Sequence, residues 1–256
     1  MVDLISSFSI LTSEGVLLYI LKGVAFTLII SVISVTFGVV FGSVLALVRN
    51  YCNHNIARVF KWISIAYIEL FRNTPLLLWL FICLVFCPVP ESFTHKMFGL
   101  TSVEAKILFR SAVALILFTS SVIAEIVRGG LNSIDDGQFE AGYSQGFSSV
   151  QVMWHIALPQ AFRAIVPTLL GQIITTIKDS SYIANVAVIE LMSRVRKILS
   201  ISGMYNGIEK QLVSDVFVLF GFAFFIYFVI NFTLSCLVRY SQKRRERVSS
   251  FSRFAT

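Results

Sequence analysis

The chain has 256 residues, of which 56% are hydrophobic and 14% are charged, with a mean hydropathy of +0.81 and a formal net charge of +7. Soluble domains contain roughly 45–50% apolar and about 25% charged residues, so the composition excludes an ordinary soluble domain and indicates an integral membrane protein. The basic residues lie mostly in short runs beside apolar segments, and six of them fall in the last 18 residues. This arrangement favours membrane flanks over nucleic-acid binding.

Five apolar stretches are long enough to cross a membrane. A transmembrane helix needs about 20 mostly apolar residues to cross about 30 Å of hydrocarbon. The predicted spans are 23–48, 57–89, 107–127, 164–191 and 213–238, within a single all-α membrane domain that covers residues 1–256. The N-terminus has no basic segment and no small-residue cleavage pattern, so we expect the first apolar run to remain as a span.

The first two spans carry features that a simple apolar helix lacks. Gly38 and Gly42 form a GxxxG pattern in the first, which lets another helix approach closely. The purely apolar part of the second span would reach only about 21 Å. Its helix must therefore begin earlier and include Glu69 and Arg72, with a kink expected at Pro75.

The distribution of Lys and Arg predicts the orientation of the chain. An odd number of spans places the two termini on opposite sides, and basic residues gather in short cytoplasmic loops. With the basic tail 239–256 inside, the cytoplasmic side holds 11 basic residues and the outer loops hold six. We therefore predict an outer N-terminus, a cytoplasmic C-terminus and a cytoplasmic loop at 129–162.

This cytoplasmic loop is polar and punctuated by glycine. Asp135 and Asp136 stand where they can cap a short helix, which Gly146 is expected to end. A serine at 148 or 149 can cap a second helix, which Pro159 is expected to end. The spacing alone is compatible with an ordered connector as well as with a docking element.

The same loop resembles the EAA loop of ABC importer permeases, whose pattern is EAA, three residues, G, nine residues, I, one residue and LP. The matching residues are Glu140, Ala141, Gly142, Gly146, Ile156, Leu158 and Pro159. The match is complete except at Gly142, where the family has a second alanine. Four further segments, 68–81, 124–138, 158–172 and 177–191, resemble the polar amino-acid subfamily, with Asn73 in place of a usual glycine.

The resemblance covers about residues 23–238 and implies a MetI-like type I ABC importer permease fold. It implies a permease subunit, embedded in lipid of a bacterial inner membrane, that imports a polar or basic amino acid. The partners that it implies are a second copy of the permease, a dimer of ABC ATPase subunits on which the EAA loop docks, and a periplasmic amino-acid-binding protein. The chain has no G-x-x-x-x-G-K-[ST] phosphate loop, so ATP hydrolysis is expected on the partner and this chain is not expected to be an enzyme.

Charged residues lie in the middle of the predicted fourth span. Lys178 and Asp179 occupy a depth where a charge costs about 2.5–3.5 kcal/mol and usually faces a cavity or a partner. With Ser180 and Ser181 they are candidates for the substrate pathway, which the resemblance favours. The alternative is a structural pairing with a carboxylate of the second or third span or with a helix end. Glu190 is expected at the outer end of the span, where water solvates a charge.

Three residues of the second span, Glu69, Arg72 and Thr74, are further candidates for the substrate pathway. Glu69 and Arg72 are three residues apart, so one helical turn places them on one face. The spacing alone favours a structural role, in which these two side chains neutralise each other. Glu125 and Arg128 repeat the spacing near the inner end of the third span and are expected to pair in the same way.

No metal or cofactor site is expected, because the four cysteines form no CxxC pair and no histidine cluster lies near them. Two other functions remain open from the residues alone. An ion-gradient-driven secondary amino-acid carrier would also place polar residues near the midplane, but five spans are few for inverted repeats. An intramembrane enzyme would need a nucleophile with a base or paired carboxylates, and the chain has no HExxH or GxSxG motif.

Overall fold

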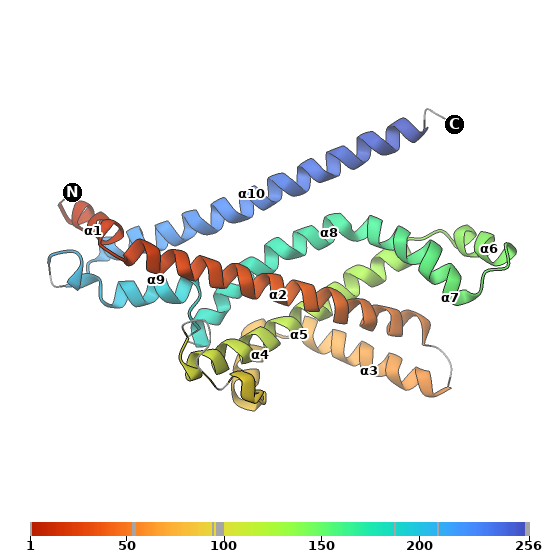
Figure 1. Ribbon diagram of the computed structural model, residues 1–256, viewed down its shortest axis with the longest axis horizontal. Coiled ribbons are helices and arrows are strands. Elements are labelled where there is room, and N and C mark those ends of the chain that lie inside the picture. The colour runs from red at the N-terminus through yellow and green to blue at the C-terminus, as the bar shows by residue number, and fades with distance from the viewer. Residues whose placement is uncertain are drawn as a thin grey trace. The chain divides into compact units, whose positions relative to one another are not determined.

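The computed structural model describes residues 2–52, 55–93, 95, 100–186, 188–208 and 210–253; for 2–4, 55–56, 241 and 243–253 the description is limited to the backbone. All the regular secondary-structure elements in this part of the chain are helices (Figure 1). The longer ones are α1 (Val2–Thr12), α2 (Val16–Tyr51), α3 (Asn55–Arg72), α4 (Leu76–Phe86), α5 (Ser102–Asn132), α6 (Asp136–Ser144), α8 (Leu158–Asp179), α9 (Leu191–Ser200) and α10 (Val213–Arg253). The shorter ones are α7 (Ser149–Val152), a π-helical turn at Met153–Ala157, and 3₁₀ turns at Glu91–Phe93, Ser180–Val186 and Ser202–Met204.

Among the residues that the structure describes, three helices are each long and apolar enough to cross a membrane: α2, α5 and the part of α10 up to Tyr240. The segments Ala57–Arg72 and Leu76–Phe86 meet the same criterion only when they are taken together as one broken span. These helices overlap four of the predicted spans, namely 23–48, 57–89, 107–127 and 213–238. The total of five spans and the orientation of the termini stay predictions.

The helix boundaries differ from those predicted for the first, second, fourth and fifth spans. α2 begins at Val16, ahead of the predicted start at Gly23, and α10 continues beyond 238 into the basic tail. The predicted fourth span is not one helix, because α8 ends at Asp179 and a 3₁₀ turn follows it. The second span is interrupted rather than kinked, since α3 ends at Arg72, and the residue before Pro75 is restricted to extended conformations.

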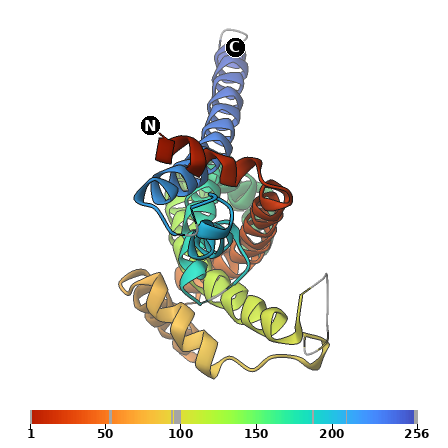
Figure 2. The same ribbon diagram turned by 90° about the vertical axis from the view of Figure 1, so that its left-hand side faces the viewer.

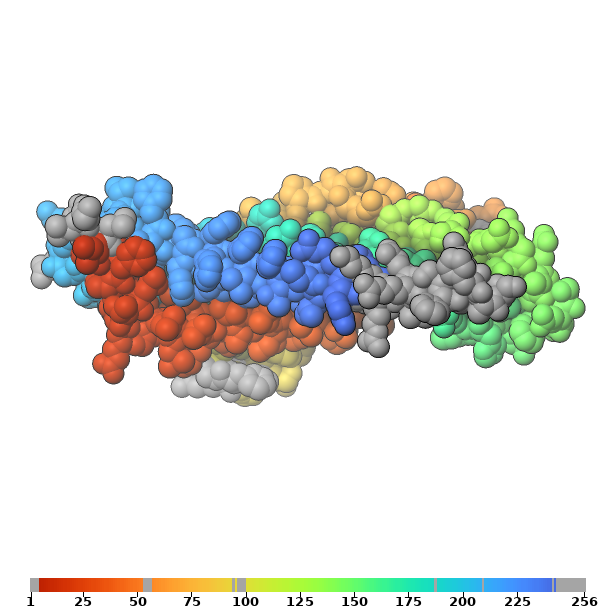
Figure 3. All heavy atoms as spheres, turned by 90° about the horizontal axis from the view of Figure 1, so that it is seen from above, coloured from red at the N-terminus to blue at the C-terminus, as the bar shows by residue number. Residues whose placement is uncertain are grey.

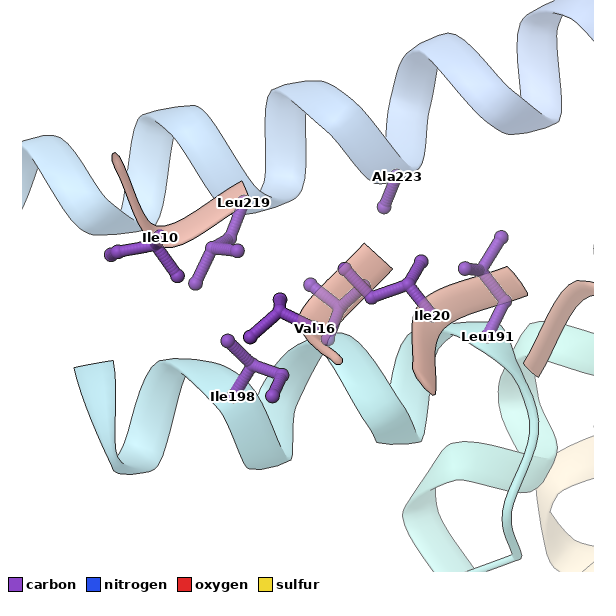
Figure 4. Packing of buried hydrophobic residues seen from close by; sticks show 8 residues of the cluster. Ile10, Val16, Ile20, Leu191, Ile198, Leu219 and Ala223 are labelled. Carbon is purple, nitrogen blue, oxygen red and sulfur yellow. The ribbon is translucent and has the colours of Figure 1, made fainter. Parts of the chain in front are cut away.

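The chain divides into two compact units, and the first consists of Met1–Ile33, Leu76–Leu115 and Ile174–Leu237. Its core gathers side chains from α1, α2, α9 and α10 (Figure 4). The fully enclosed members include Ile10, Ile20, Leu191, Val195 and Leu219. Figure 2 shows α1 running across the beginnings of α2 and α10. The helix therefore covers the end of this core at which α2 and α10 begin.

The second unit consists of Ser34–Pro75, Ile116–Ile173 and Val238–Thr256. Its core lies between α2, α5 and α8 and contains Ala46, Ile123, Val127, Leu131, Leu158, Ala161 and Ile165. The GxxxG pattern serves this packing: a Cβ atom on Gly42 would lie 2.7 Å from the Ser120 carbonyl oxygen and 2.9 Å from the Ala124 nitrogen. The predicted close approach of another helix is confirmed, and that helix is α5 of the same chain.

Candidate functional site

The segment with the EAA-like motif begins with the short helix α6. The Asp135 side chain caps it by accepting a hydrogen bond from the Gly137 N–H at 2.7 Å. Gly146 ends it in a left-handed conformation with φ of 85°, which glycine adopts without strain. Both predictions for this helix are confirmed.

A second helical segment follows directly and is capped as the sequence indicates. Ser148 forms a capping box with Gln151, whose side-chain oxygen accepts from the Ser148 N–H at 2.8 Å. The prediction that Pro159 ends this segment is wrong, because α7 passes through the π-helical turn into α8 without a break. Pro159 is the second residue of α8, and the change of hydrogen-bond register in the π turn accommodates its missing N–H.

The segment is folded back tightly on itself. Gly142 is buried, and a Cβ atom there would lie 2.8 Å from Ile156 Cδ1 and 2.9 Å from Val152 Cγ2. The glycine that departs from the family pattern therefore lets α6 pack closely against the second helical segment. Gln160 also donates to the Gln138 side chain at 3.0 Å, which ties the start of α8 to α6.

The outer surface of this segment carries both charge and apolar area. Glu140 and Ala141 are exposed, whereas Leu158 and Ala157 are buried and Ile156 is partly buried. Four large apolar side chains are also exposed: Tyr143, Phe147, Val150 and Trp154. Exposed apolar side chains on a rigid, polar-rimmed element are typical of a protein-docking surface.

Five charged residues of the second unit form one network, with Glu125 at its centre. Glu125 Oε2 accepts from Arg49 Nη1 at 3.0 Å and lies 3.7 Å from Arg72 Nη1, and Glu125 Oε1 accepts from Arg128 Nε at 2.8 Å. The predicted pair between Glu125 and Arg128 is confirmed. The predicted mutual pairing of Glu69 and Arg72 is wrong, because Arg72 reaches Glu125 and Glu69 lies 3.6 Å from Arg49 Nη1.

Two polar side chains that follow α3, Asn73 and Thr74, form hydrogen bonds to carbonyl groups in its last turn. Thr74 Oγ1 donates to the Leu70 carbonyl at 2.6 Å, and Asn73 Nδ2 donates to the Glu69 carbonyl at 2.8 Å. The Thr74 bond satisfies a carbonyl group in the last turn of the helix, and the Asn73 side chain adds a second donor to the Glu69 carbonyl, which also accepts from the Asn73 N–H at 3.1 Å. Asn73 thus has a structural role here that a glycine could not fill.

Lys178, Asp179, Ser180 and Ser181 lie where α8 changes into the 3₁₀ turn, in the first unit. Lys178 is exposed, Asp179 is partly buried, and Ser180 is buried and donates to the Ile177 carbonyl at 2.7 Å. Within the described part of the chain, neither Lys178 nor Asp179 makes an ion pair. Glu69, Arg72 and Thr74 belong to the second unit.

Sequence reasoning missed the burial of Glu190, which was expected in a solvated position. Glu190 is fully buried, and its carboxylate accepts from Tyr227 Oη at 3.2 Å, from Thr27 Oγ1 at 3.5 Å and from the Ser193 N–H at 2.6 Å. The signal available in the sequence was the apolar run on both sides of this residue. Glu190 is the N-cap of α9 and joins α9 to α2 and α10.

Arg194 of α9 is a second buried charge that the sequence did not indicate. Its guanidinium lies over the Tyr19 ring, 4.3 Å from the centroid, and donates to the Tyr19 carbonyl at 2.9 Å. Burial lowers the pKa of this guanidinium. A Cβ atom on Gly23 would lie 2.7 Å from Arg194 Cδ, so the glycine makes room for the arginine stem.

Known proteins resemble this chain over most of its length. Residues 38–247 match the family described as binding-protein-dependent transport system inner membrane component. The glutamate/aspartate import permease protein GltK of Escherichia coli O6:H1 is 34% identical, over 88% of this chain and 93% of the relative. The probable glutamine ABC transporter permease protein GlnM of Bacillus subtilis is 33% identical, over 89% of this chain and 93% of the relative.

Two solved structures share the fold. A chain of the crystal structure of an amino acid ABC transporter with histidines superposes with a TM-score of 0.67, at 26% identity, covering 88% of this chain and 94% of that chain. A chain of the MetNI methionine ABC transporter in an inward-facing conformation gives a TM-score of 0.63 at 22% identity, covering 89% and 98%. The second likeness concerns the fold alone.

These comparisons confirm the MetI-like fold and the expectation that the chain is a multi-pass membrane permease rather than an enzyme. They give no support to a secondary carrier. The match extends from α2 into α10 and includes the α6–α8 segment described above. The chain therefore belongs to the family of binding-protein-dependent transport system inner membrane components.

Proposed function

We propose that this chain is the permease subunit through which an ABC importer moves a polar or basic amino acid across a bacterial inner membrane. A separate pair of ATPase subunits supplies the energy, a periplasmic binding protein delivers the amino acid, and a second copy of the permease completes the pathway. The relatives are named for glutamate/aspartate, glutamine, arginine and L-cystine. All of these substrates carry an α-amino and an α-carboxylate group, which supports a pathway able to recognise both charges.

The observation that carries the proposal is the rigid segment from Asp135 to Pro159. A mechanical link between two proteins must not deform when it is pushed, and this segment has two capped helices and a buried glycine contact. Its exposed face supplies Glu140 and Trp154, a charge and an aromatic anchor of the kind found at interface hot spots. We propose this face as the docking surface for the ATPase.

Two variants test the docking surface. Trp154→Ala removes a side chain that is 66% exposed, and Phe224→Ala on α10 removes one that is 70% exposed but lies on a predicted membrane span. We expect Trp154→Ala to reduce co-purification of the ATPase and Phe224→Ala to leave it unchanged. Glu140→Lys should uncouple ATP hydrolysis from amino-acid transport in proteoliposomes. Equal behaviour of Trp154→Ala and Phe224→Ala, with normal coupling in Glu140→Lys, contradicts the docking role.

We propose that Lys178, Asp179, Ser180 and Ser181 line the pathway in the first unit. A backbone that leaves the α-helical pattern inside a membrane is tolerated where it lines a cavity or is buried in protein, and α8 changes to a 3₁₀ turn at Ser180. The unpaired charges of Lys178 and Asp179 match the two charges of an amino acid. Asp179→Asn should weaken the stimulation of ATPase activity by arginine; an unchanged response assigns Asp179 a structural role.

In the second unit, Glu69, Arg72 and Thr74 are the proposed pathway residues. Glu69 and Arg72 are the outer, more exposed members of the charged network, at 48% and 38% exposed, and their ion-pair distances of 3.6 and 3.7 Å are the longest in it. Loosely paired charges can exchange partners with a charged substrate at low cost. Arg72→Gln should raise the substrate concentration needed for half-maximal transport. Transport that persists without ATP and follows a proton or sodium gradient would instead support a secondary carrier.

A further inference from the structure

We propose that α1 is a membrane-surface anchor, lying in the lipid boundary on the side where α2 begins. With 11 residues, α1 is only about 16 Å long and cannot cross about 30 Å of hydrocarbon. Figure 2 shows it running across the beginnings of α2 and α10 instead of continuing along α2. Gly15, with φ of 82°, makes the turn between α1 and α2. A short helix set across the start of a membrane span has the placement of an interfacial helix.

One face of α1 is fixed to the rest of the first unit. Ser7 and Ile10 are fully buried, and Ile10 belongs to the core shared with α2, α9 and α10. Ser7 Oγ donates to Asp215 Oδ1 at 2.6 Å, and Ser9 Oγ lies 3.3 Å from the Tyr205 carbonyl oxygen. In Figure 3 the N-terminal residues lie beside the first half of α10. The orientation of α1 about its own axis is therefore determined by packing.

Asp215 makes this attachment rigid. Its carboxylate is fully buried and accepts from Ser7, from Ser202 Oγ at 2.8 Å, from Asn206 Nδ2 at 3.0 Å and from the Leu212 N–H at 2.9 Å. These donors come from α1 and from the connection between α9 and α10. A buried carboxylate with several donors holds its partners in fixed positions, because losing any one donor leaves charge poorly solvated.

The opposite face of α1 is apolar and unusually exposed. Ile5 is 67% exposed and Phe8, one turn further on, is 53% exposed. The hydroxyl groups on the same helix bond to carbonyl groups of the helix itself: Ser9 to Ser6 at 2.6 Å and Thr12 to Ser9 at 3.0 Å. This face therefore presents apolar side chains with little unsatisfied polarity, which suits the boundary between headgroups and acyl chains.

The neighbouring helix ends favour lipid over a soluble protein as the occupant. Leu17 and Leu18 at the start of α2, and Val213 and Phe217 at the start of α10, are also exposed. Both helices are long and apolar enough to be membrane spans, and the hydrocarbon of a bilayer is the surrounding that apolar side chains on such spans require. The buried face of α1 fixes the helix beside these ends, through Ser7 on Asp215 and Ile10 in the core shared with α2 and α10, so its exposed apolar face stands next to them. Residues 5–12 carry no charged side chain, and the one charged residue of α1 in the sequence, Asp3, is acidic and does not attract anionic lipid. The attraction is therefore apolar rather than electrostatic.

Site-directed spin labelling of the assembled transporter in proteoliposomes tests the anchor. The four native cysteines are first replaced by serine, and a nitroxide is attached at Phe8→Cys or Ile5→Cys. We expect both labels to collide more with oxygen than with a water-soluble nickel complex, at a depth of about 5–10 Å below the lipid phosphates. Lys197→Cys, on the exposed side of α9, is the control and should be accessible to the nickel complex.

Additional measurements distinguish contact with lipid hydrocarbon from electrostatic attraction to anionic lipid and from contact with a protein partner. The depth at Phe8→Cys should be the same in phosphatidylcholine and in phosphatidylglycerol vesicles and should not change in high salt. Nickel accessibility at Phe8→Cys equal to that at Lys197→Cys overturns the proposal. So does protection that appears only when the binding protein is added, since that would identify a protein partner. Tryptophan at position 8 (Phe8→Trp), quenched by brominated lipid, gives a second readout that needs no cysteine replacement.

Discussion

Glu125 is the residue whose replacement tests the charged network most directly. It is the shared partner of Arg49, Arg72 and Arg128, and its side chain is 21% exposed. Glu125→Gln keeps the shape of the side chain but removes the charge that holds three guanidinium groups together. The remaining glutamate of the network, Glu69, lies within ion-pair distance only of Arg49. The variant therefore leaves three arginines with one carboxylate.

The expected cost follows from the contacts and their exposure. A hydrogen bond to a charged group contributes about 1.5–3 kcal/mol, and breaking a fully buried pair costs about 3–5 kcal/mol. Glu125 accepts three hydrogen bonds, from Arg49 Nη1 at 3.0 Å, from Arg128 Nε at 2.8 Å and from Arg128 Nη2, but solvent reaches the network. We expect Glu125→Gln to lower the free energy of unfolding by about 2–3 kcal/mol, in the upper part of the range for a charged hydrogen bond and below the cost of breaking a fully buried pair. For a chain of this size that corresponds to a melting temperature lower by roughly 4–12 °C.

The assay is thermal unfolding of the detergent-solubilised protein, with Glu69→Gln as the matched control. Glu69 is 48% exposed and its ion pair is long, so its loss should cost no more than about 1 kcal/mol. Adding Arg72→Gln to Glu125→Gln should recover part of the loss, because it removes one of the uncompensated charges. Equal shifts for the two glutamate variants, or no recovery in the double variant, would refute the assignment of Glu125 as the centre of the network.

Three further predictions concern glycine contacts and a helix cap. Gly42→Leu should prevent accumulation of folded protein in the membrane, because the new side chain would meet backbone atoms of α5, whereas Gly129→Ala, with open space around it, should accumulate normally. Gly142→Leu should separate α6 from Ile156 and reduce the ratio of transport to ATP hydrolysis. Gly142→Ala adds a single methyl group that meets side-chain atoms of Ile156 and Val152 and no backbone atom, so it should retain most of that ratio; equal loss in both variants would contradict this. Ser148→Ala should cost about 1 kcal/mol of local helix stability, seen as faster hydrogen exchange at 149–152, and unchanged exchange would show that the cap is dispensable.

Features that depend on neighbours in the sequence could be predicted from the sequence alone. Four of the apolar segments, the caps at Asp135 and Ser148 and the glycine stop at Gly146 all follow from patterns within a few residues. The ordered match to the EAA loop likewise depends on spacing along one segment. Such features are fixed by local geometry, so their partners can be identified before any tertiary contact is known.

Features that depend on distant partners were decided only by the tertiary structure. Arg49 and Glu125 are 76 residues apart, and Thr27 and Glu190 are 163 apart. Helical periodicity places Glu69 and Arg72 on one face of α3. Nevertheless Glu69 pairs with Arg49 of α2 and Arg72 pairs with Glu125 of α5, because both of these partners are more buried. Burial of Glu190 likewise depends on α2 and α10 packing around it. The sequence alone determined which segments are apolar and which segment, 135–159, carries the two helix caps. Packing between helices determined where each charge finds its partner, because the strength of an ion pair depends on its surroundings.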